Sequence, residues 1–156
     1  MLMAVILAAA PVSDAEWQGD VRASVQAVLP HAMTSFAARC RDRLPEGAYL
    51  TRNAPRLAAR LQPAADAARP RALKAAVRYG LLRAEPGESD AGKAARLLAL
   101  FDAKVVGTTV APPQCAAISD LLQPLEPLPP ENLAAFIAQV AMTLFLGKTP
   151  HREPSH

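Results

Sequence analysis

Apolar side chains recur along most of the chain at the three- and four-residue spacing of an α-helix. A stripe that starts after residue 15 continues to Leu44 across Pro30, which predicts a second or a kinked helix beyond that proline. Residues 44–53 contain proline and glycine and are expected to form a loop. Further helices are predicted over residues 54–62, 70–84, 89–107, 112–124 and 131–147, with proline or glycine at most of their ends. The pattern therefore predicts an all-α fold, a small single-domain bundle of about five to six short helices.

The first ten residues, MLMAVILAAA, form an uncharged apolar run of the length found in signal-peptide cores and too short to span a bilayer. Small side chains at Ser13 and Ala15 suit cleavage before Glu16, and residues 8–10 offer a second site. No Lys or Arg precedes the run, which departs from the usual signal pattern, and a buried first helix or strand is the alternative. We predict a secretory signal peptide over 1–15, a helical domain over 16–147, without a transmembrane span, and a flexible tail over 148–156. The expected location is periplasmic or secreted, or cytoplasmic if residues 1–15 are retained.

Two cysteines, Cys40 and Cys115, are separated by 75 positions. In an exported chain such a pair usually forms a disulfide, and a loop of this length would stabilise the fold by roughly 4 kcal/mol in the chain-entropy model. Two buried free thiols are the alternative. Because neither cysteine lies in a Cys-x-x-Cys motif or beside a histidine, we expect neither redox catalysis nor metal binding from them.

Positive charge is concentrated in the middle of the chain. The net charge is +3, but residues 39–83 hold eleven basic residues against three acidic ones, whereas residues 84–156 hold five against eight. Helical spacing places these bases in two stripes, one of them on the face opposite Leu73, Val77 and Leu81. The alternative is a solvated outer face that the acidic half of the chain partly neutralises. The candidate anion-binding residues are Arg52, Arg56, Arg60, Arg71, Lys74 and Arg78.

Catalytic chemistry is not predicted by any motif. His31 lies beside a proline, the other two histidines lie in the tail, and no base is placed near a serine or cysteine by spacing. Glu85, Glu88 and Asp90 gather near one loop, where negative charge favours the start of a helix. We therefore assign no catalytic residue, no metal site and no cofactor.

With 51% hydrophobic and 20% charged residues, the chain is too apolar to be wholly disordered. The prediction is an exported binding protein of the cell envelope with a basic face for an anionic partner, which is a lipid head group, a polysaccharide or an acidic protein. The alternatives are a cytoplasmic nucleic-acid-associated protein and a small enzyme of unknown class. Nucleic acid is the weaker case, because the few aromatic side chains do not alternate with the bases. A deep pocket lined by Glu85, Glu88 or His31 would favour the enzyme.

Overall fold

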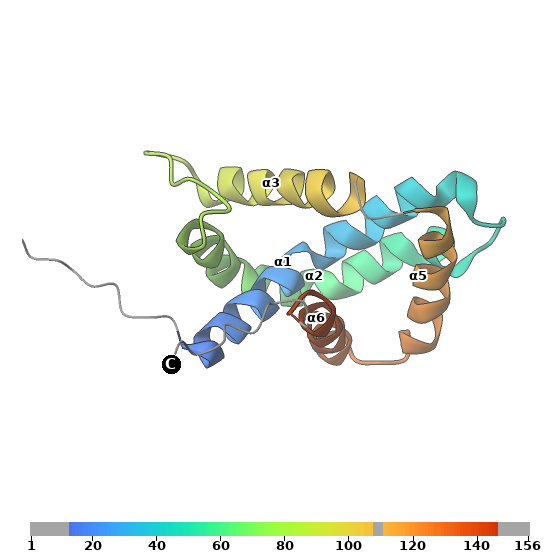
Figure 1. Ribbon diagram of the computed structural model, residues 1–156. Helices are drawn as coiled ribbons and strands as arrows, with labels where there is room; N and C mark the ends of the chain where they lie inside the picture. Colours follow the sequence, from blue (N-terminus) through green and yellow to red (C-terminus); the bar gives the residue numbers. More distant parts are fainter. Residues whose placement is uncertain (1–12, 108–110, 147–156) are drawn as a thin grey trace, which may run out of the picture.

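Two long helices, α1 (Asp14–Cys40) and α2 (Tyr49–Arg78), run alongside each other and form the centre of the fold (Figure 1). The computed structural model describes residues 13–107 and 111–146, and within them the protein is all-α, which confirms the predicted fold class. The remaining elements are the 3-10 turn η1 (Arg41–Arg43), α3 (Asp90–Phe101), the π-helical turn η2 (Asp102–Val106), α5 (Pro112–Leu125) and α6 (Pro130–Leu146). In Figure 1, α3 lies above the hairpin, α6 lies below it, and α5 crosses the end where the hairpin turns.

The prolines of the two long helices lie inside them. The predicted loop over 44–53 is shorter than expected, because α2 begins at Tyr49, and the predicted helix end at Pro63 is wrong. Pro55, Pro63 and Pro70 recur every seven or eight residues on an exposed face, so the carbonyl groups that lose an N–H donor there can be hydrated. The opposite face is buried, and its burial offsets the cost of the prolines. This buried face includes Leu50, Ala54, Leu57, Leu61, Ala65, Ala72, Leu73 and Ala76.

The first helix, α1, begins at the cap that its sequence suggests but is not divided at Pro30. Ser13 precedes α1, and its hydroxyl accepts a hydrogen bond from the backbone N–H of Glu16 at 3.2 Å, so it is the N-cap. Pro30 is buried within α1, which is one continuous helical element and not two. The predicted signal peptide up to residue 12 and the predicted tail lie outside the described residues.

The end of α2 is a Schellman motif built on Gly80, whose φ is +72°. The backbone N–H of Leu81 donates to the carbonyl of Ala76 at 2.8 Å, and that of Gly80 donates to the carbonyl of Val77 at 3.1 Å. The helix predicted over 70–84 therefore ends earlier, at Arg78. As a result Leu81, assigned by spacing to the buried stripe, is 57% exposed.

The core lies between the α1–α2 hairpin and the helices α5 and α6, and the disulfide closes it. Cys40 at the end of α1 is joined to Cys115 in the first turn of α5, with their Cα atoms 5.5 Å apart, and both residues are fully buried. The predicted disulfide is thus confirmed. Beside it, the hydroxyl of Ser119 accepts a hydrogen bond from the backbone N–H of Leu50 at 3.1 Å, which ties α5 to the start of α2.

Candidate functional site

The helix α3 packs less closely than its neighbours. Its sequence is amphipathic, and Ser89 caps it by accepting a hydrogen bond from the backbone N–H of Gly92 at 3.1 Å. Yet none of its side chains is fully buried, and those on its apolar face remain partly exposed. This incomplete packing leaves two cavities between α3 and the α1–α2 hairpin.

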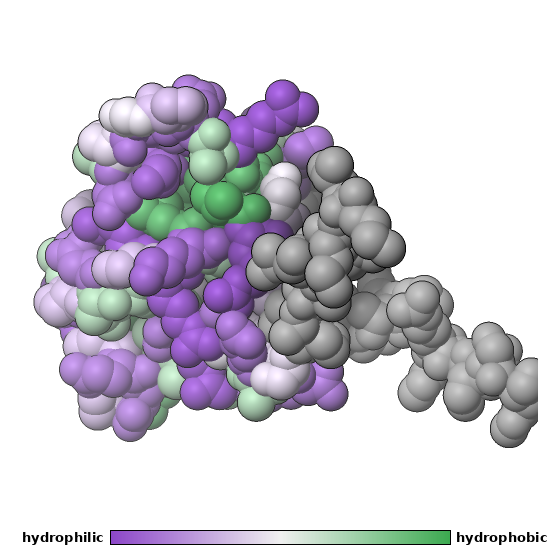
Figure 2. All heavy atoms as spheres, turned by 90° about the vertical axis from the view of Figure 1, so that its left-hand side faces the viewer, coloured by the Kyte–Doolittle hydropathy of each residue, from purple (hydrophilic) through white to green (hydrophobic). Residues whose placement is uncertain are grey.

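The larger cavity is an open groove of about 430 Å³ between α2 and the start of α3, which we call the α2–α3 groove. Four apolar residues and four charged residues line it. Figure 2 looks at the end of the molecule where α2 ends and α3 begins, and it shows a hydrophobic patch framed by hydrophilic residues. The groove is lined by Pro70, Leu73, Lys74, Val77, Arg78, Ala84, Asp90 and Lys93.

The three cations of the groove differ in how far they are already neutralised. Arg78 donates to the carboxylates of Glu16 and Asp20, at 2.5 and 2.9 Å. The ammonium of Lys93 lies 3.1 Å from the carboxylate of Asp90, and the Lys93 side chain is 25% exposed whereas that of Asp90 is 77% exposed. Lys74 is exposed and makes no ion pair within residues 13–107 and 111–146. Among the described residues, Lys74 is therefore the groove cation without an ion-pair partner, and Lys93 is partly neutralised by Asp90, which also lines the groove.

The buried carboxylate of Asp20, next to the groove, binds two arginines of the predicted stripe, Arg71 and Arg78. Asp20 is 4% exposed and accepts hydrogen bonds from Arg71 Nε at 2.8 Å, from Arg78 Nη1 at 2.9 Å and from the Tyr79 hydroxyl at 3.0 Å. The bond from Arg71 has the largest effect on the pKa of Asp20, and despite the opposing effect of burial the pKa lies below its usual value. Two of the three stripe residues, Arg71 and Arg78, thus hold α2 against α1 through Asp20. The third, Lys74, makes no ion pair among the described residues.

The other predicted stripe runs along the first half of α2. Arg56 pairs with Glu126, and Arg60 donates to the backbone carbonyls of Glu126 and Leu128, each at 2.9 Å. These two residues therefore fasten α2 to the connection between α5 and α6. Arg52 is exposed in the first turn of α2. The two stripes do not form one continuous unpaired surface.

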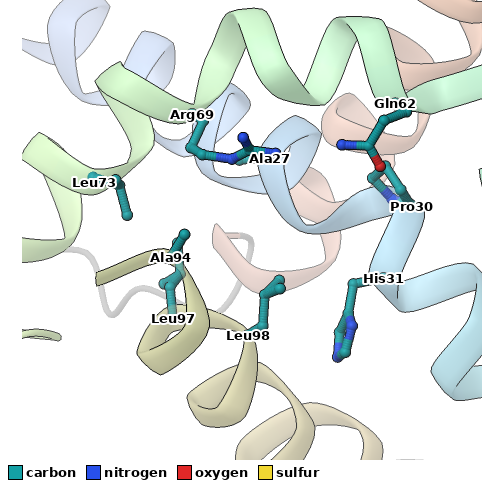
Figure 3. A pocket seen from close by; sticks show the side chains of 9 residues that line it. All are labelled: Ala27, Pro30, His31, Gln62, Arg69, Leu73, Ala94, Leu97 and Leu98. Carbon is teal, nitrogen blue, oxygen red and sulfur yellow. The ribbon is translucent and has the colours of Figure 1, made fainter. Parts of the chain in front are cut away.

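The smaller cavity, about 120 Å³, lies on the other side of Leu73 and is bordered by His31, so we call it the His31 cavity (Figure 3). All three helices contribute to it: α1 and α2 form two walls, and α3 covers them with apolar side chains. Its lining residues are Ala27, Pro30, His31, Gln62, Arg69, Leu73, Ala94, Leu97 and Leu98.

A polar cluster of His31, Ser35 and Asp102 joins α1 to the start of η2. His31 Nε2 lies 2.8 Å from Asp102 Oδ2 and 3.2 Å from Ser35 Oγ, and that hydroxyl donates to Asp102 Oδ1 at 3.0 Å. In a nucleophile–base–carboxylate triad the serine and the carboxylate meet different nitrogens of the imidazole, whereas here both meet Nε2. Burial alone would raise the pKa of Asp102, but the bonds from His31 and Ser35 outweigh it and lower the pKa. This arrangement connects two helices and is not set up to activate Ser35.

Sequence reasoning missed this cluster because Asp102 lies 71 positions after His31 and 67 positions after Ser35. The only available signal was the pair His31 and Ser35, which share a helix face at i and i+4. Of the carboxylates near the loop after α2, Glu85 and Glu88 both pair with Arg96, at 3.1 and 2.9 Å, and neither lines the groove or the His31 cavity.

No protein-family model, curated protein or solved structure gives a significant match to the chain. The site is therefore interpreted from its own residues. Among the described residues, no helix combines the length and the apolar character needed to cross a membrane.

Proposed function

We propose that this chain is an exported binding protein of the cell envelope that holds an anionic partner in the α2–α3 groove. The observation that carries the proposal is the pairing of an apolar floor, formed by Pro70, Leu73 and Val77, with lysines at the rim. Charge attraction to Lys74 and Lys93 favours the binding of an anion at the rim. Burial of an apolar part of the same partner on the floor adds to the binding free energy.

The composition of the groove favours one kind of anionic partner over another. A polysaccharide or nucleic acid offers charge and hydroxyl groups but little aliphatic surface, so the floor would stay unused. A lipid offers both an anionic head group and aliphatic carbon, which match the two halves of the groove. The partner we propose is therefore an anionic lipid-like molecule of the envelope.

Export is supported by the disulfide between Cys40 and Cys115, since such bonds persist in oxidising compartments and are rare in reducing ones. The intact mass of the protein from its native host, with thiol alkylation before and after reduction, tests this part of the proposal. We expect a mass that begins near Glu16 or, with cleavage after residues 8–10, a mass that keeps the Ser13 cap of α1, and in either case no alkylation until reduction. A full-length mass with two alkylated thiols would rule out export.

Binding is tested by co-sedimentation of the exported protein as recovered from its host, with its disulfide intact, with vesicles of phosphatidylglycerol and of phosphatidylcholine. We expect binding to the anionic vesicles only. The variant K74A/K93A removes both rim lysines, and at about 1 kcal/mol for each lysine near an anionic surface it should bind roughly 30-fold more weakly.

The matched control is R41A/R52A, which also removes two positive charges. Arg41 and Arg52 are exposed near the turn of the hairpin, and neither lines the groove. Along α2 alone, Arg52 and Lys74 are separated by roughly 33 Å at the usual helical rise. We expect this control to bind within about twofold of the unchanged protein. Equal losses in the two variants, or a loss confined to the control, would refute the groove as the binding site.

A further inference from the structure

We propose that the α2–α3 groove binds a single-chain anionic amphiphile, such as the carboxylate of a fatty acid, whose chain passes Leu73 and ends in the His31 cavity. This inference rests on the proposed function, because it uses the same rim lysines. It adds the chemical class of the ligand, its direction in the site and a second compartment for its chain.

The first support is that the two cavities share a wall. Leu73 lines both of them and is itself 4% exposed, so the groove and the space under α3 adjoin at this side chain. Apolar residues continue on both sides of it, with Val77 in the groove and Leu97 and Leu98 in the His31 cavity. The groove alone falls within the roughly 300–1,000 Å³ typical of small-molecule sites, and the His31 cavity extends it.

The second support is that charge lies at one end. Lys74 and Lys93 border only the groove, whereas the covering wall of the His31 cavity consists of Ala94, Leu97 and Leu98. The cation of that cavity, Arg69, pairs with Asp66, just as Lys93 pairs with Asp90 at the groove. Among the described cations that line either cavity, Lys74 at the groove is the one that makes no ion pair. A ligand with one anionic group at the end of an aliphatic chain matches this distribution, with its carboxylate at the rim.

The third support is that the wall over the chain can yield. Because α3 buries none of its side chains fully, moving it outward costs less apolar contact than moving α1 or α2 would. The loop before α3 contains Gly87, whose φ is +77°, and glycine tolerates backbone rearrangement there. Entry of a chain beneath α3 is therefore compatible with the rest of the fold remaining in place.

The test is titration calorimetry of the exported protein as recovered from its host, disulfide intact, with monomeric octanoate, decanoate, dodecanoate and tetradecanoate, and with decanol as the uncharged probe. Burial of each added methylene should tighten binding by about fourfold until the space is filled. K74A/K93A should weaken decanoate binding at least about tenfold and leave decanol binding unchanged.

The position of the chain is tested by A94W, which places a large side chain in the His31 cavity, against A95W, which changes an exposed neighbour that lines neither cavity. We expect A94W to bind octanoate normally but to lose the gain from longer chains, and A95W to behave as the unchanged protein. The smaller substitution A94L serves the same purpose if A94W does not fold.

The outcomes separate this inference from the proposed function. Vesicle binding that depends on the rim lysines, together with no dependence on chain length, would overturn the inference and leave the proposed function standing. A chain-length dependence that A94W and A95W share would also overturn it, since the chain would then lie elsewhere. Failure of both the vesicles and the free carboxylates to bind would refute the inference and the proposed function together.

Discussion

Replacement of Gly19 by alanine is expected to destabilise the protein when Arg71 is present and to stabilise it when Arg71 is absent. Gly19 lies inside α1, and the guanidinium of Arg71 packs against it. A Cβ atom at position 19 would stand 2.7 Å from Cζ of Arg71, so the guanidinium has to move. In the present position Arg71 Nε donates to Asp20 at 2.8 Å, and we expect displacement of this half-exposed side chain to break that bond.

Two opposing effects set the change in the free energy of unfolding that G19A produces. Alanine in a helix interior is favoured over glycine by roughly 0.5–1 kcal/mol. A hydrogen bond to a charged group contributes about 1.5–3 kcal/mol, and the lower end applies here because the Arg71 side chain is half-exposed. We therefore expect G19A to lower the free energy of unfolding by about 0.5–1 kcal/mol, and to raise it by about the same amount in an R71A background.

Urea unfolding of the unchanged protein, G19A, R71A and G19A/R71A, all with the disulfide oxidised, gives the complete thermodynamic cycle. The expected coupling free energy between the two positions is about 1.5 kcal/mol. If G19A stabilises the protein equally in both backgrounds, the Arg71 side chain accommodates the new Cβ atom without losing its bond to Asp20, and the reasoning is refuted.

Three further predictions concern stability. Replacing Cys40 and Cys115 together by serine should lower the free energy of unfolding by roughly 4 kcal/mol, and reductant should produce a similar loss in the unchanged protein, measured by urea unfolding. The Tyr49 hydroxyl is buried and makes no hydrogen bond of ordinary geometry among the described residues, although burial and the nearby Glu126 carboxylate both raise the pKa of Tyr49. Y49F should therefore leave the melting temperature unchanged or raise it, and a fall by several degrees would show that the hydroxyl bonds to Glu126. Because the pKa of Asp20 is lower in the folded than in the unfolded chain, its contribution is present above pH about 4 and is lost as the pH falls through the folded-state pKa. D20N should flatten this part of the acid dependence, and an unaltered curve would show that Asp20 is not the group responsible.

The helices were largely predictable because their apolar spacing is a local property of the chain. The helix that begins after Ser89 and the helix from Pro130 lie where they were predicted, although the first continues as the π-helical turn η2 after Phe101. The apolar stripe of the second is only partly right, because Phe136 is 42% exposed. The prolines were misleading at Pro63 and Pro70, because a proline on an exposed face costs less than the burial of the opposite face gains. That balance depends on the packing of α2 against α1, which spacing alone does not encode.

The candidate site was predictable only as a set of charges. Spacing correctly places Arg71, Lys74 and Arg78 on neighbouring turns, but it does not say that Asp20 lies opposite two of them, 51 and 58 positions away. The groove beside Lys74 was not predicted at all. It results from the incomplete packing of α3, a property of the space between helices and not of any one segment.

The covalent bond between Cys40 and Cys115 turns the intervening chain into a closed ring that contains α2 and α3 but not α6. When α3 moves away from α2, the ring limits how far it can travel, so its apolar face stays at a high effective concentration near the groove. Opening is then a local event within a tethered loop, and it does not require separation of the helices that the disulfide joins. The backbone amides of α3 should accordingly exchange with solvent hydrogen well before those of α1. Removal of the disulfide lowers the free energy of global unfolding, through which the α1 amides exchange, so it should speed exchange in α1 most and reduce this difference.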